Sequence, residues 1–204
     1  MSIKLDINKR DWEQVKRIGG RLLLGGKTWV IPDEIQDINP FAKWLPEVEG
    51  HIVQKPYFSV RAKCVCWKCK RETPVVALGA KSYQALVYET ADNPLWEKVA
   101  DDRLIFTEID RLDERISAYM QANYPFFQQQ YSVKLESRVW GNCCVHCQAL
   151  QEEDGEYTFG LANPLSPGTI EAAKEIRIIF FKLEFDYYIS SGYEWCDFYL
   201  EIMP

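Results

Sequence analysis

Two cysteine pairs have the spacing that binds transition metals. Cys66 and Cys69 lie in the stretch CVCWKCKRE, and Cys144 and Cys147 lie in GNCCVHCQA. A Cys-x-x-Cys turn presents two sulfur atoms to one ion, and structural Zn²⁺ takes four such ligands in a tetrahedron. The sequence therefore predicts that these four cysteines together bind one structural Zn²⁺.

The separation of the two pairs sets a condition for this site. Seventy-four residues lie between Cys69 and Cys144, whereas compact zinc ribbons separate their pairs by about 15–20 residues. The fold must therefore bring the pairs together and carry the intervening segment as an insertion. Basic side chains around the first pair would offset the negative charge of a zinc tetrathiolate; they are Lys63, Lys68, Lys70 and Arg71.

Two other interpretations of the pairs stay open. A redox site of the thioredoxin type needs a helix directly after Cys-x-x-Cys, but the residues after Cys69 are β-prone and include Pro74. The other interpretation is a set of unliganded core thiols, because cysteine is often buried. Zinc binding is the interpretation that we favour.

The chain holds seven cysteines, and three of them lie outside the pairs. We interpret Cys64, Cys143 and Cys196 as packing residues, and we expect His146, inside the second pair, to point away from the metal. Whether Cys64, Cys143 or His146 replaces one of the four ligands stays open.

Residues for catalysis are scarce. General acid–base chemistry at neutral pH usually recruits histidine, and the chain has only two. We expect His51 to be a solvated loop residue and the acidic stretch EEDGE (152–156) to be a solvated turn. The stretch GRLLLGGKT (20–28) is one residue too long for a P-loop and leads into a strand instead of a helix. The sequence therefore predicts no enzymatic activity.

Composition indicates a globular protein with an acidic balance. The 204 residues are 47% hydrophobic and carry a formal net charge of −6, although residues 1–31 are basic. No apolar run approaches the roughly 18 residues of a membrane helix, and the N-terminus lacks the apolar segment of a signal peptide. An odd number of cysteines suits a reducing compartment. We therefore expect a cytoplasmic protein without a membrane partner.

The pattern predicts an α+β protein in two parts. Residues 1–47 have the order of a small β-α-β-β module, in which Trp12, Val15 and Ile18 form a helical stripe. Its core is expected to be closed by Trp29, Phe41 and Trp44. A linker over 46–57 follows, and residues 57–204 are expected to form a larger, β-rich domain that contains the zinc ribbon.

Within the larger domain, the pattern predicts strands around both cysteine pairs and one helix. The helix is expected over 107–122, with Thr107 as its N-cap and an apolar stripe along one face. A strand is expected over 131–140, and another over 181–190, where apolar and polar residues alternate.

Residues 5–46 resemble the small bacterial domain of unknown function that is often appended to plasmid conjugation primases. That pattern has a strand, a short helix, a second strand with Trp-Tyr-Val-Pro and a closing Pro-Phe-x-x-Trp-Leu, and Leu22 replaces its first Trp. The later part is similar to uncharacterised bacterial proteins with split zinc ribbons. The positions that match the first pattern are Gly19, Arg21, Lys27, Trp29, Pro32, Pro40, Phe41, Trp44 and Leu45.

Two functions are consistent with these features. The first is a non-enzymatic, zinc-stabilised binding protein, acting as an adaptor, inhibitor or immunity-type factor through a protein partner; the acidic charge suggests that this partner is basic. The alternative is a nucleic-acid-binding accessory factor of a plasmid or other mobile element, because cations beside an aromatic ring are typical of single-strand binding. Its candidate residues are Lys63, Trp67, Lys68, Lys70 and Arg71.

Overall fold

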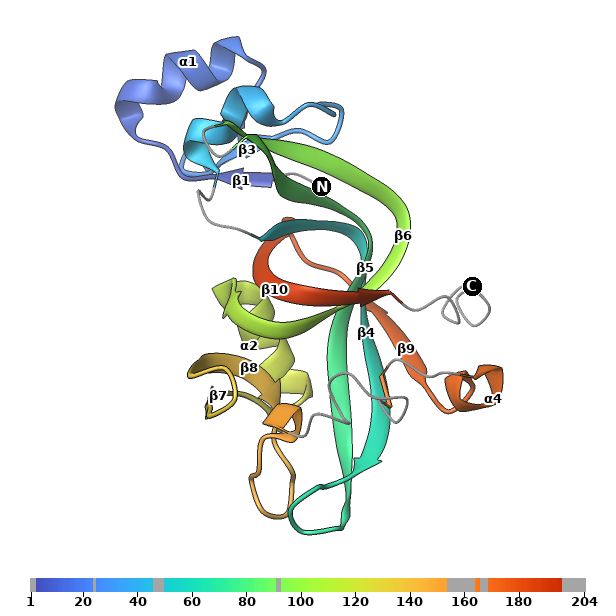
Figure 1. The fold of residues 1–204 in the computed structure, drawn as a ribbon. Helices are drawn as coiled ribbons and strands as arrows, with labels where there is room; N and C mark the ends of the chain where they lie inside the picture. Colours follow the sequence, from blue (N-terminus) through green and yellow to red (C-terminus); the bar gives the residue numbers. More distant parts are fainter. Residues whose placement is uncertain are drawn as a thin grey trace.

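The computed structural model describes residues 3–23, 25–45, 50–90, 93–153, 164–165 and 169–195. The chain is mostly β-sheet with a small helical part, so the expected α+β class is found. Figure 1 shows a small N-terminal unit above long, curved strands. None of the helices among the described residues is long and apolar enough to cross a membrane.

The N-terminal unit has a three-stranded antiparallel sheet of its own, with the order β1-β3-β2. The expected cluster is present: Val15 and Phe41 are fully buried, and the Trp12 and Trp29 rings lie 5.9 Å apart. Gly20 packs so tightly that a Cβ would lie 2.3 Å from the Val15 side chain. The elements are β1 (Ile3–Leu5), η1 (Lys9–Asp11), α1 (Trp12–Arg17), β2 (Arg21–Leu22), β3 (Trp29–Ile31) and η2 (Asn39–Trp44).

This unit shares its core with the end of the large sheet. Ile52 and Trp96, which belong to the large sheet, are buried in the same apolar cluster. The Asn39 side chain accepts from the Trp96 N–H at 2.7 Å and donates to its carbonyl at 3.0 Å. The unit is therefore anchored to the large sheet by both apolar packing and hydrogen bonds.

The predicted linker over 46–57 is wrong from residue 51 onward, because β4 (His51–Val65) already begins there. His51 is consequently not a solvated loop residue. It is buried, with ring centroids 5.2 Å from Tyr83 and 5.6 Å from Phe106, and burial lowers its pKa. Its imidazole is part of the packing between strands.

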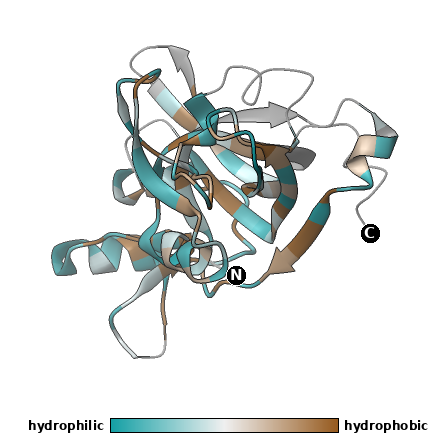
Figure 2. Cartoon of the chain, turned by 90° about the horizontal axis from the view of Figure 1, so that it is seen from below, coloured by the Kyte–Doolittle hydropathy of each residue, from teal (hydrophilic) through white to brown (hydrophobic). Residues whose placement is uncertain are grey.

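The large sheet closes on itself through four long strands. β4 pairs with β5 (Glu72–Thr90), β5 pairs with β6 (Asn93–Leu112), and β10 (Tyr187–Trp195) pairs with both β6 and β4. In Figure 2, hydrophobic and hydrophilic segments alternate along these strands, as expected for strands with one buried face. The strand β9 (Arg177–Phe181) extends the sheet beside β4, and the short helix α4 (Ile170–Ala173) precedes it.

The helix predicted over 107–122 is wrong in its first part. Residues 107–112 belong to β6, where Thr107 pairs with Gly192 and Ile109 pairs with Trp140. The helix α2 (Glu114–Asn123) begins later, and its N-cap is Asp113, whose side chain accepts from the Arg115 N–H at 2.9 Å. Strand pairing across the sheet outweighs the helical spacing of the apolar residues.

Two further strand predictions are corrected. Residues 131–140 are not one strand but the ends of a hairpin, β7 (Phe127–Ser132) and β8 (Ser137–Asn142). The alternating run over 181–190 is split between β9 and β10, which pair with different segments of β4. Over 181–190 the alternation identifies buried residues such as Phe185, Tyr187 and Ile189, whereas Tyr131 and Val133 are exposed. In neither place does the pattern show where the chain turns.

Candidate metal centre

The four predicted cysteines come together in space. The sulfur atoms of Cys66, Cys69, Cys144 and Cys147 all lie within 4.8 Å of one another. Cys66 Sγ is 3.7 Å from Cys147 Sγ, and Cys69 Sγ is 3.7 Å from Cys144 Sγ. A tetrahedron with metal–sulfur bonds of about 2.3 Å has edges of about 3.8 Å. The cluster therefore has the donor atoms and the size to hold one metal ion.

The first pair lies on a tight turn between β4 and β5. The Cys66 N–H donates to the Arg71 carbonyl at 2.9 Å, and the Lys70 N–H donates to the Cys66 carbonyl at 2.9 Å. Lys70 has a φ of 59°, in the left-handed region that bulky residues rarely adopt. This turn directs both sulfur atoms to the same side.

The second pair repeats this turn at equivalent positions. The Cys144 N–H donates to the Ala149 carbonyl, and the Gln148 N–H donates to the Cys144 carbonyl, both at 2.9 Å. Gln148 also has a φ of 59°. The two turns share this backbone geometry although their side chains differ, so each presents two sulfur atoms in the same way. Cysteines that only pack in a core would not require such a repeat. We call residues 66–71 the first knuckle and residues 144–149 the second.

Asn142, at the end of β8, joins the segment that carries the second knuckle to β5, the strand that follows the first knuckle. Its side chain accepts from the Val76 N–H at 2.8 Å and donates to the Val76 carbonyl at 2.9 Å, in the way a neighbouring strand would. Two more contacts join each knuckle to the residue that follows the other knuckle. The Trp67 Nε1–H donates to the Leu150 carbonyl at 2.8 Å, and His146 Nε2 lies 3.0 Å from the Glu72 carbonyl oxygen. The long strands thus position the second knuckle against the first (Figure 1).

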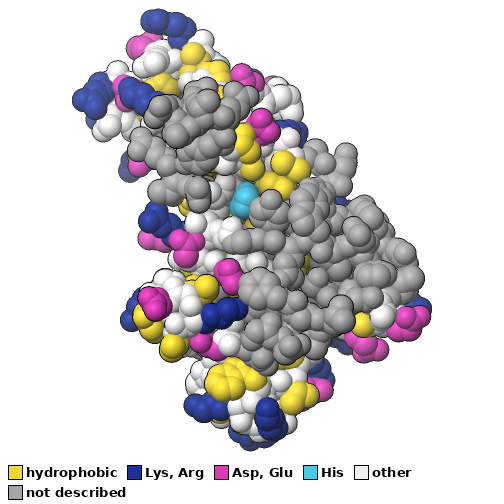
Figure 3. All heavy atoms as spheres, in the orientation of Figure 1, with side chains coloured by type: hydrophobic (Ala, Val, Ile, Leu, Met, Phe, Trp, Pro, Cys, Tyr) yellow, Lys and Arg dark blue, Asp and Glu magenta, His cyan; other side chains and the backbone are white. Residues whose placement is uncertain are grey.

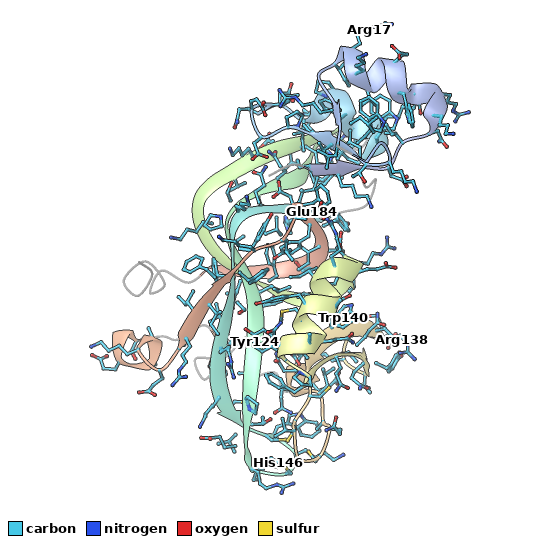
Figure 4. All side chains as sticks on the ribbon, turned by 180° about the vertical axis from the view of Figure 1, so that it is seen from behind. Arg17, Tyr124, Arg138, Trp140, His146 and Glu184 are labelled. Atoms are coloured by element: carbon cyan, nitrogen blue, oxygen red, sulfur yellow. The ribbon has the colours of Figure 1, made fainter. Side chains whose placement is uncertain are left out.

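The other candidate ligands lie outside the cluster. His146 contacts a backbone carbonyl through Nε2, and Figure 4 shows it at the far end of the long strands. Cys143 packs in a small apolar cluster, and burial raises the pKa of its thiol to about 11. The Cys64 thiol lies 3.9 Å from Gln151 Oε1. Cys196 is outside the described residues.

The ionisation of the cysteines favours a bound cation. The Arg71 N–H, together with the Arg71 side chain, lowers the pKa of Cys69 to about 6. Although the Ala149 N–H acts in the opposite direction, burial and the neighbouring sulfur atoms raise the pKa of Cys147 to about 11. Clustered thiols cannot all ionise together without a positive charge among them. A metal ion at the centre would supply that charge.

A buried glutamine that the sequence did not single out supports the cluster. Gln151 is 1% exposed and lies in η3 (Gln151–Glu153). Its Nε2 donates to Cys66 Sγ at 3.6 Å and to the Ala149 carbonyl at 2.6 Å. Amide donors of this kind orient metal ligands and disperse thiolate charge. Only its position four residues after Cys147 hints at this role.

The acidic stretch 152–156 was predicted to be a solvated turn, and this is wrong for Glu152. Its carboxylate accepts from the Asn142 N–H at 2.9 Å and from Asn142 Nδ2 at 2.8 Å. Burial raises the pKa of Glu152 to about 7. A cavity of about 30 Å³ beside it has room for about one water molecule. Residues 154–156 lie outside the described part of the chain.

The residues named for nucleic-acid binding share one exposed end of the molecule. All five have exposed side chains, and Lys63 forms an ion pair with Glu72 at 2.7 Å. They surround the first knuckle at the tip of the β4–β5 hairpin. The five are Lys63, Trp67, Lys68, Lys70 and Arg71.

Comparisons with known proteins identify no relative. No family model, no curated protein and no solved structure matches the chain. The resemblance to the primase-associated domain and to split zinc ribbons therefore stays a prediction, and the site must be interpreted from its own geometry.

Proposed function

We propose that the chain is a non-enzymatic binding protein whose zinc-bearing end contacts a protein partner. One observation carries this proposal. Seven large hydrophobic side chains are exposed among the described residues, and three of them lie on the knuckles or directly before the first one. Exposed apolar side chains gathered on one part of a protein typically mark an interaction site. The three are Val65, Trp67 and Val145. Two others, Tyr131 and Val133, lie at the turn end of the β7–β8 hairpin, away from the second knuckle.

The metal in this proposal is Zn²⁺, with a structural role. Four cysteine sulfurs at tetrahedral spacing suit Zn²⁺ or an iron–sulfur centre, and Zn²⁺ needs no redox partner. With all four positions filled by protein, no site is left for a water molecule or a substrate. The ion would hold the two turns of a split zinc ribbon together.

The surroundings of the titratable groups fit a protein without catalysis. His51 is packed among aromatic rings, His146 contacts a backbone carbonyl, and Glu152 is engaged by Asn142 beside a cavity of water size. A reducing, cytoplasmic setting suits free thiols that bind zinc. The adaptor, inhibitor and immunity-type roles all fit such a protein.

The test combines metal analysis with partner capture. Protein purified without chelator should contain about one equivalent of zinc per chain and no iron. The tagged chain should retain a protein partner from the cytoplasm in which it is made, and chelation should release that partner. Protein without zinc, or capture that chelation leaves unchanged, contradicts the proposal.

A second candidate function is that of a nucleic-acid accessory factor of a mobile element. It is favoured by the exposed cations Lys68, Lys70 and Arg71 around Trp67. Binding through phosphates weakens steeply as salt concentration rises. A fluorescently labelled single strand titrated with the protein at two salt concentrations tests this alternative, because an apolar protein contact would change little.

A further inference from the structure

The two knuckles present a small surface that combines apolar and basic side chains. Val65 is 66% exposed, Trp67 38% and Val145 44%. Figure 3 shows hydrophobic side chains beside Lys and Arg at the lower end of the molecule, where the hairpin β4–β5 ends in Figure 1. We call this surface the knuckle tip and define it by its exposed side chains: Lys63, Val65, Trp67, Lys68, Lys70, Arg71 and Val145.

The knuckle tip is held in shape before any partner arrives. The Trp67 ring is fixed by the hydrogen bond from Nε1 to the Leu150 carbonyl, and the Val145 N–H donates to Thr73 Oγ1 at 3.1 Å. Each of these bonds joins one knuckle to the structure beside the other. A surface that is already ordered loses little conformational entropy on binding.

The charge of the knuckle tip is opposite to that of the whole chain. The chain has a formal net charge of −6, yet the tip carries four cations with Glu72 as the adjacent acid. Lys63 pairs with Glu72 at 2.7 Å, so this cation already has a local partner. Lys68 and Lys70 are exposed at the rim of the apolar patch. A complementary surface would place carboxylates there.

The apolar part of the tip favours protein over nucleic acid. Single-strand binding relies on aromatic faces on which bases stack, but Val65 and Val145 are aliphatic and offer no such face. Trp67 has its indole edge turned to Leu150 by the hydrogen bond. Branched aliphatic side chains framed by cations match apolar side chains framed by carboxylates.

We propose that the knuckle tip binds an acidic segment of a partner protein, with apolar side chains seated on Val65, Trp67 and Val145 and carboxylates facing Lys68 and Lys70. This deepens the proposed function and rests on it. It also reverses the expectation of a basic partner, because the overall negative charge does not describe this end of the molecule.

Site-specific photo-crosslinking in the intact cytoplasm tests the proposal. The variants Val65→p-benzoylphenylalanine and Val145→p-benzoylphenylalanine place the probe on the tip. Leu22 and Phe180, which are 40% and 41% exposed, receive the same probe as controls. We expect crosslinks from the two tip positions only, to a protein segment rich in Asp and Glu. Retention of one zinc per chain confirms that each variant is folded.

Charge reversal then tests the carboxylate contact. In the presence of Lys68→Glu and Lys70→Glu, the crosslink yield should fall about tenfold, because like charges oppose encounter and docking. The matched control is Lys16→Glu with Arg17→Glu, two exposed cations on α1, which should leave the yield unchanged.

The outcomes separate this inference from the proposed function. Crosslinks to nucleic acid, to a segment without acidic residues, or from Leu22 and Phe180 alone would overturn the inference. An unchanged yield with the reversed charges would overturn it as well. If no position crosslinks to any protein and capture also fails, the proposed function falls together with the inference.

Discussion

The N-terminal unit and the knuckle tip are two small regions that differ in how they are stabilised. Both are small and lie at opposite ends of the long strands (Figure 1). The N-terminal unit buries Val15, Phe41 and other apolar residues in a core that extends to Ile52 and Trp96. Beside the tip, the buried members of the apolar cluster among the described residues are Val139, Cys143 and Leu150. Val65 and Val145 are exposed there.

The difference indicates that a region held together by a metal ion could leave apolar side chains exposed. Small units bury little apolar surface and often need a staple such as a metal. The N-terminal unit uses its aromatic residues for its own stability. At the knuckle tip, a metal ion held by the four sulfur atoms would take over that task, and the proposed function assigns Val65 and Val145 to contact with a partner.

The largest expected effect is the loss of the metal site. Replacing Cys144 with serine removes one ligand, and we expect loss of stoichiometric zinc and a fall in the free energy of unfolding of at least about 5 kcal/mol. Metal binding in structural zinc sites contributes directly to folding. Zinc content by mass spectrometry and denaturant unfolding measure the two effects.

The matched control for this variant is Cys64→Ser. Cys64 lies near the cluster, but its sulfur is outside the four that meet. It should keep about one zinc per chain. If both variants lose zinc equally, or if neither does, the assignment of the four ligands is contradicted.

The N-terminal unit should respond to a different substitution. Phe41 is fully buried, so Phe41→Ala should lower the free energy of unfolding by about 3–5 kcal/mol through lost packing and a cavity. Zinc content should not change, because the cluster lies at the other end. A parallel loss of zinc would show that the two regions are not stabilised independently.

The sequence predicted the local parts of this comparison well. Cys-x-x-Cys spacing is a property of a single turn, so both pairs could be recognised without the fold. The Trp12, Val15 and Ile18 stripe is equally local, and its packing against Phe41 is found. Where a structure depends on residues that are close in the chain, the types and the spacing of those residues are enough to predict it.

Long-range pairing was not visible in the sequence. Ile109 and Leu112 have helical spacing with Ile116, yet they belong to a strand because β10 and β8 pair with β6 there. Glu152 looks like part of a solvated turn until the fold places Asn142 against it. Such contacts join segments that only the sheet brings together, and no local pattern records them.

The half-buried Glu152 carboxyl, which accepts from the Asn142 N–H, should make the stability of the protein depend on pH. Burial raises the pKa of Glu152 from 4.5 to about 7 in the folded state. Between these values the unfolded chain is ionised while the folded chain keeps its proton. The free energy of unfolding should therefore fall as pH rises from about 5 to 7, by at most about 3 kcal/mol from this group.

Glu152→Gln isolates this contribution because glutamine keeps an oxygen that can accept from Asn142 but stays neutral. With zinc in excess, its stability relative to the wild type should increase between pH 5 and pH 8. Denaturant unfolding at several pH values gives this difference. A difference that stays constant with pH would show that Glu152 does not ionise in this range.

The smallest expected effect lies in the support of the metal ligands by Gln151. Its Nε2 donates to Cys66 Sγ at 3.6 Å, and such contacts tune metal affinity. Gln151→Leu removes the donor and should weaken zinc binding about tenfold, the lower end for residues that contact metal ligands. Competition with a chromophoric chelator measures this affinity, and Gln129→Leu on the exposed face of β7 is the control.

Replacing Zn²⁺ with Co²⁺ adds a spectroscopic readout that a change in packing alone would not alter. Without the N–H···S bond, the Cys66 thiolate holds its electrons less tightly, so the sulfur-to-cobalt charge-transfer band should move to lower energy. If the affinity falls while this band stays in place, Gln151 acts through packing and not through the sulfur.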